Sequence, residues 1–129
     1  MSYGTAVVLD RPFADTVADV RQALSDQGFG VLTEIDVQAT MKAKIDVDID
    51  PYLILGACNP SLAHRALQAE PSIGLLLPCN VIIRQVDQGT VVEAVDPMTL
   101  ATVTGNPALQ PVVDEAASRL RAALDSLTT

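Results

Sequence analysis

Two cysteines are the most reactive side chains of the chain, and both lie in similar sequence settings. Cys58 ends an apolar run and is followed by Asn59 and Pro60, while Cys79 follows Leu-Leu-Leu-Pro and precedes Asn80. A helix beginning at Pro60 would favour a nearby thiolate, which is a nucleophile and a metal ligand, through the partial positive charge of its N-terminus. If the two motifs lie side by side, we expect a pocket formed by Cys58, Asn59, Cys79 and Asn80.

Three functions are compatible with these cysteines. We favour a non-catalytic binding module that holds a small molecule or a metal, because pockets commonly form where polar atoms gather at strand ends. The alternative is a thiol-dependent redox or sulfur-transfer enzyme, in which Cys58 attacks and Cys79 resolves the intermediate. The third is a purely structural interaction domain, since free cysteines are often buried as small apolar side chains. The sequence indicates no cofactor and leaves open whether the protein is an enzyme.

A metal site would have to use the single histidine. Cys58, His64 and Cys79 together provide three ligands, whereas a structural zinc usually has four protein ligands. No Cys-x-x-Cys or His-Glu-x-x-His spacing is present. We therefore predict no metal site. If a metal were bound, Cys58, His64 and Cys79 would be the candidate ligands, and a second chain would have to supply any missing ligand.

Charged residues offer weaker candidates. Glu34 and Asp36 lie on one face of a predicted strand, where they could act as paired carboxylates or simply form a solvated face. Lys42 and Lys44 could bind an anion or only maintain solubility. Three alternating aspartates between residues 46 and 50 have calcium-loop spacing but lack the glycine and distal glutamate of an EF-hand. None of these patterns predicts a specific site.

The elements that position the cysteines follow from apolar periodicity, which predicts a single domain over residues 1–129. Strands are expected over Tyr3 to Leu9, Val31 to Gln38, Tyr52 to Cys58, Cys79 to Val86 and Thr90 to Val95. Helices are expected from Phe13 to Gly28, from Ala39 to Ile45, from Pro60 to Glu70 and from Asn106 to Leu127. The alternation in the second strand predicts one buried face. The order β-α-β-(α)-β-α-β-β-α predicts a two-layer α+β domain, with a mixed sheet of about five strands and helices on one face.

Composition limits the partners. The 129 residues carry a formal charge of −8, and the 49% apolar content includes no Trp, two Tyr and two Phe. An acidic chain with few aromatic residues is not expected to bind nucleic acid or an anionic membrane surface. No apolar run approaches the length of a membrane span, and the N-terminus lacks an export signal. We therefore expect a cytoplasmic protein with reduced cysteines.

The runs Tyr52 to Pro60 and Leu75 to Val81 contain the Cys-Asn-Pro and Leu-Pro-Cys motifs, and with them the chain resembles domain-of-unknown-function family 302. The likeness extends from the helix at Phe13 to the terminal helix. It implies a two-layer α+β fold with the β-α-β-β-β-β-α topology of TATA-box-binding-like domains, and a homodimer, but no established activity. Relatives often carry Arg where this chain has Asn80, so the resemblance gives less support to an anion site here.

Overall fold

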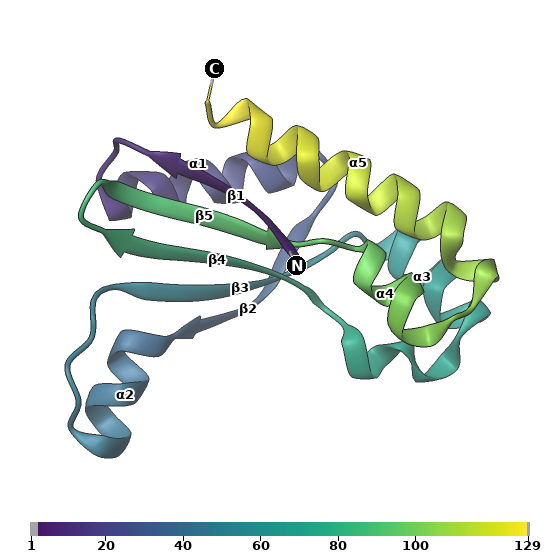
Figure 1. The fold of residues 1–129 in the computed structure, drawn as a ribbon, viewed down its shortest axis with the longest axis horizontal. Helices are drawn as coiled ribbons and strands as arrows, with labels where there is room; N and C mark the ends of the chain where they lie inside the picture. The colour runs from purple at the N-terminus through teal and green to yellow at the C-terminus, as the bar shows by residue number, and fades with distance from the viewer. Residues whose placement is uncertain (1–2, 129) are drawn as a thin grey trace.

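Five strands form one sheet in the computed structural model, which describes residues 3–128 (Figure 1). The strands are β1 (Gly4–Leu9), β2 (Gly30–Asp36), β3 (Tyr52–Cys58), β4 (Cys79–Val86) and β5 (Gly89–Val95). Their order across the sheet is β1-β5-β4-β3-β2. The predicted α+β class and the strand content implied by the family resemblance are confirmed.

All four strand pairings are antiparallel, so the expectation of a mixed sheet was wrong in this detail. A strand–helix–strand unit at the start of the chain suggested a parallel pair. The two strands of that unit, β1 and β2, do run in the same direction, but they form opposite edges of the sheet. Three strands separate them, and no parallel ladder forms.

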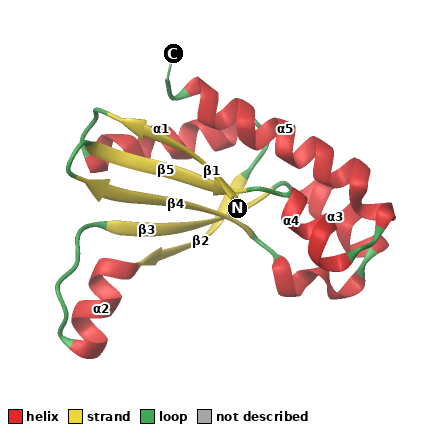
Figure 2. Ribbon diagram, viewed as in Figure 1, coloured by secondary structure: helices red, strands yellow, loops and turns green. Residues whose placement is uncertain are grey.

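Two long helices cover one face of the sheet, and the shorter helices lie beyond its ends (Figure 2). The helices are α1 (Phe13–Asp26), α2 (Val37–Ile45), α3 (Pro60–Ala69), α4 (Met98–Thr104) and α5 (Gln110–Ser126), with 3₁₀ turns η1 (Pro71–Leu76) and η2 (Pro107–Leu109). Helices α1 and α5 pack on the sheet and against each other. At one end of the sheet, α3 and α4 gather beside the first half of α5, whereas α2 projects from the opposite end (Figure 1).

The buried side chains form two separate clusters. The sheet cluster joins the strands to α1 and the second half of α5, with residues such as Val20, Ile83 and Leu124. The helical cluster joins α3, η1 and η2 to the first half of α5, with residues such as Leu62 and Val113. Because α5 contributes to both clusters, it connects the sheet to the group of short helices.

Strand β2 does not bury the face that its alternating sequence predicted. Only Val31 is half-buried, and the rest of the strand is exposed, including Leu32 at 67% and Ile35 at 48%. The ladder with β3 also shifts between Val31 and Thr33, which disturbs the alternation. As an edge strand, β2 has no fully buried side chain, and only Val31 packs against the margin of the core under α1 and α5.

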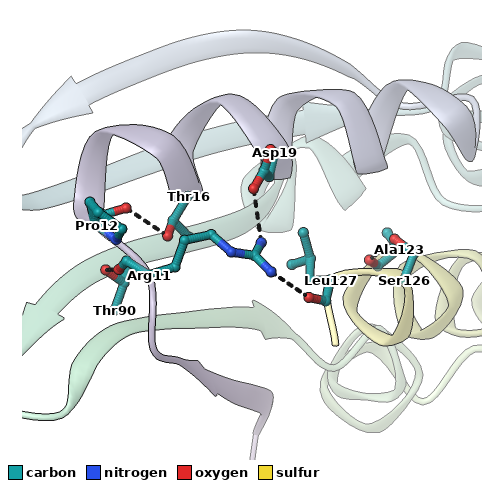
Figure 3. A network of polar contacts seen from close by, with 8 residues as sticks. All are labelled: Arg11, Pro12, Thr16, Asp19, Thr90, Ala123, Ser126 and Leu127. Atoms are coloured by element: carbon teal, nitrogen blue, oxygen red, sulfur yellow. Dashed lines mark hydrogen bonds and ion pairs between the residues drawn. The ribbon is translucent and has the colours of Figure 1, made fainter. Parts of the chain in front are cut away.

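Arg11 joins the turn after β1 to the end of α5 (Figure 3). Its guanidinium donates to Asp19 Oδ2 at 2.8 Å and to the Leu127 carbonyl at 3.0 Å. The buried Thr90 hydroxyl donates to the Arg11 carbonyl at 2.8 Å. A cation at a helix C-terminus satisfies a carbonyl that has no partner within the helix and opposes the negative end of the dipole. These contacts hold α5 in place across the sheet.

Candidate functional site

Cys58 lies at the junction between β3 and α3. Asn59 has the extended conformation of an N-cap, and its side-chain oxygen accepts a hydrogen bond from the Leu62 backbone N–H at 3.3 Å. Pro60 begins the helix, where its missing N–H costs little. The predicted strand-to-helix turn is confirmed, and it holds Cys58 half-buried beside the N-terminus of α3.

Cys79 is the first residue of the neighbouring strand β4. It pairs with Ala57 in the β3–β4 ladder, so Cys58 is only one residue further along β3. Its side chain is buried, and both cysteines are free thiols. The sheet thus brings together two thiols that are distant in sequence, and both border the same cavity.

This cavity, which we call the thiol cavity, has a volume of about 360 Å³. It lies between the two buried clusters: Phe29 and the cysteines border it from the sheet side, and Leu62 and Val112 border it from the helical side. Its walls are formed almost entirely by hydrocarbon. Concave apolar sites of this size accommodate small molecules. Because the walls offer few polar groups to hold water, an apolar ligand would displace water from the cavity easily.

The electrostatics at Cys79 oppose thiolate chemistry. Burial, and to a smaller extent the charge of a neighbouring Cys58 thiolate, raises the pKa of Cys79 from its ordinary value of 9.0 to about 11. A thiolate is disfavoured where water is excluded. At neutral pH, Cys79 is therefore a protonated thiol, which is a poor nucleophile.

Asn80 does not belong to the thiol cavity, in contrast to the four-residue pocket expected from the sequence. Successive side chains of a strand point to opposite faces of a sheet. Cys79 faces the core of the sheet cluster, so Asn80 is exposed on the other face, where it borders a second cavity. Cys58, Asn59 and Cys79 are brought together in the thiol cavity, and Asn80 is separated from them.

His64 is exposed on α3 and does not border the thiol cavity. Within residues 3–128, no three side chains of His, Cys, Asp or Glu are grouped closely enough to hold a metal ion. The candidate ligands Cys58, His64 and Cys79 are thus not assembled by one chain.

The family model for the domain of unknown function DUF302 matches residues 5–127. The chain belongs to the DUF302 family. A solved structure, described as an uncharacterized conserved protein DUF302 from Bacillus stearothermophilus, is 28% identical in sequence and superposes with a TM-score of 0.90. The similarity covers 97% of this chain and 98% of that one. No curated protein matches the chain. These relationships establish the fold and the family.

Most of the charged candidates of this DUF302 chain have structural partners. Glu34 pairs with Arg21 at 3.0 Å, and Asp36 caps α2 by accepting the Ala39 N–H at 2.9 Å. Lys42 contacts two aspartates of the acidic turn, Asp46 at 2.9 Å and Asp48 at 3.4 Å.

No helix within residues 3–128 is both long and apolar enough to cross a membrane.

The sequence interpretation missed several residues that line the thiol cavity, including Leu100 of α4 and Val112 of α5. Their apolar side chains carry no local signal that separates a cavity wall from ordinary core. Gly56 does carry such a signal: a Cβ at this position would lie 2.7 Å from Pro78 Cγ and would overlap the Thr33 side chain. An isolated glycine within an apolar strand indicates a close approach, and Gly56 could have predicted such an approach to β3, although not that Pro78 makes it.

Proposed function

We propose that this DUF302 protein is a non-catalytic binding module that holds a small, uncharged, largely apolar molecule in the thiol cavity. The observation that carries this proposal is an apolar cavity of about 360 Å³ between two buried clusters. Burial of a ligand's hydrocarbon surface there would provide the main binding energy. The Cys58 and Cys79 thiols would act as weak, polarisable contacts to the ligand.

Thiol catalysis receives less support. In the thiol-enzyme alternative, Cys79 would have to resolve the intermediate as a thiolate after attack by Cys58, but the pKa of Cys79 is raised to about 11. A reducing compartment such as the cytoplasm would keep both cysteines as the thiols that line the cavity.

We also propose that the module is a homodimer, as its family resemblance implies. Support comes from α2, a helix of nine residues with no buried side chain. Helices of this length are marginal in water without tertiary contacts. Ile45 at its end and Val47 just beyond it are 62% and 42% exposed, so a second copy could supply the missing apolar contacts. Native mass spectrometry of the full chain would show a dimer, whereas a monomer at micromolar concentration would contradict this proposal.

The binding proposal can be tested with the neutral fluorescent probe N-phenyl-1-naphthylamine. We expect the wild-type protein to increase its fluorescence with saturation. Ala63 borders the cavity, so Ala63→Leu should fill part of it and weaken binding at least tenfold. Ala43→Leu is the matched control, because it adds the same side chain to exposed α2. Absence of wild-type binding, or equal binding by both variants, would contradict the proposal.

A further inference from the structure

A second cavity of about 390 Å³ lies on the sheet face opposite α1 and α5. Its floor is formed by β1, β3, β4 and β5, and its outer wall by α4 and the end of η1. Among residues 3–128, only Pro78, Cys79 and Leu100 border both this cavity and the thiol cavity. We call it the carboxylate cavity, because an acidic side chain is among its walls and none is among those of the other.

The acidic side chain is Glu93, half-buried at the middle of β5. Within residues 3–128, Glu93 forms no ion pair with Lys or Arg. Arg84 is on the same face but two residues further along the adjacent strand, and it is not a wall of the cavity. A half-buried carboxylate without a counterion gains from a cation that enters the cavity.

The backbone leaves room for this carboxylate. Gly4 borders the cavity on β1, and a Cβ at Gly4 would lie only 3.1 Å from Glu93 Oε2. The Glu93 side chain therefore extends across the surface that a larger residue at Gly4 would occupy. This placement puts the carboxylate beside Gly4, which borders the same cavity.

Both tyrosines of the chain, Tyr3 and Tyr52, border the same cavity. The protein has only four Phe and Tyr residues and no Trp, so this cavity is bordered by half of its aromatic side chains. Tyrosine rings attract cations through their negative faces, and the Asn80 side-chain carbonyl can accept a hydrogen bond from an ammonium group. These groups have the chemistry of an amine-binding site.

Most of the remaining walls are aliphatic. Leu76, Leu100 and Val103 border the cavity from η1 and α4, opposite the sheet residues Ile82 and Val95. We propose that the carboxylate cavity binds a primary alkylamine, with its ammonium group at Glu93 and its hydrocarbon tail against α4. The net charge of −8 would also increase the local concentration of such a cation. This site is separate from the one proposed above, and neither depends on the other.

Isothermal titration calorimetry of the full chain with n-hexylammonium chloride tests this inference, with 1-hexanol as the neutral probe of equal tail length. We expect saturable 1:1 binding of the ammonium per chain and at least tenfold weaker binding of the alcohol. Glu93→Gln should weaken ammonium binding at least tenfold. Glu34→Gln removes the same charge outside the cavity and should leave binding unchanged.

Thermal unfolding of Glu93→Gln should confirm that the variant is folded, and amide chemical shifts of the wild-type protein should change at Thr99 and Val103 on addition of the amine. Three outcomes would overturn the inference: no saturation by n-hexylammonium, equal affinity for 1-hexanol, or equal losses in the two glutamine variants. The last result would indicate general attraction by net charge. Loss of probe binding at the thiol cavity would leave this inference intact.

Discussion

Helices α2 and α3 occupy equivalent places in the topology but have different consequences. Each connects two antiparallel neighbouring strands, and each begins with an Asp or Asn side chain that accepts a backbone N–H. Helix α3 buries Leu62 and Ala66, whereas α2 buries no side chain. Because the two caps are alike, the difference in burial arises from the apolar stripe that α3 has and α2 lacks. A connecting helix builds a cavity wall only when it has a face that must be removed from water.

The strongest test of this comparison truncates one apolar residue on each helix. Leu62→Ala should lower the free energy of unfolding by about 2–5 kcal/mol, because it removes a side chain that is only 4% exposed and enlarges the thiol cavity. Ile45→Ala on α2 should change it by no more than about 0.5 kcal/mol in a monomer. Urea denaturation measures both values. Equal losses would show that α2 is packed as firmly as α3.

The raised pKa of Cys79 predicts that the free energy of unfolding depends on pH. Below pH 9 the thiol is protonated in both states, but between pH 9.0 and 11 the unfolded chain loses this proton while the folded chain retains it. The free energy of unfolding should therefore fall as pH rises, by about 1 kcal/mol between pH 8 and 10 from this group.

Urea denaturation of the wild type and of Cys79→Ala at pH 8 and 10 isolates this contribution, because lysines and tyrosines titrate equally in both proteins. The wild type should lose about 1 kcal/mol more than the variant. Equal losses would mean that Cys79 is accessible to water. In that case a thiolate mechanism would regain support.

The smallest expected difference concerns the caps. Asn59→Ala should lower the free energy of unfolding by about 1 kcal/mol, because α3 is part of the cooperative core. Asp36→Ala removes a similar cap from α2, but this helix can fray without unfolding the sheet. Its effect should appear as faster amide hydrogen exchange within α2, with global unfolding nearly unchanged. A global loss equal to that of Asn59→Ala would show instead that α2 unfolds together with the core.

Local sequence signals determined the elements that carry the cysteines. The apolar run from Tyr52 to Cys58 predicted β3, and Asn59 followed by Pro60 predicted the start of α3. These predictions succeeded because strand propensity and helix capping act over a few neighbouring residues. The family resemblance had the same origin, since its motifs lie at these junctions.

Only the tertiary structure decided which faces and walls these elements share. The alternation in β2 did not show that this strand would lie at an edge with no fully buried side chain. The Cys79-Asn80 pair did not show that Asn80 would be absent from the thiol cavity that Cys79 borders. The placement of Glu93 near both tyrosines likewise depends on β1, β3 and β5 sharing a sheet. Strand order and helix packing are set by burial among residues far apart in the chain, and a local pattern contains no record of those partners.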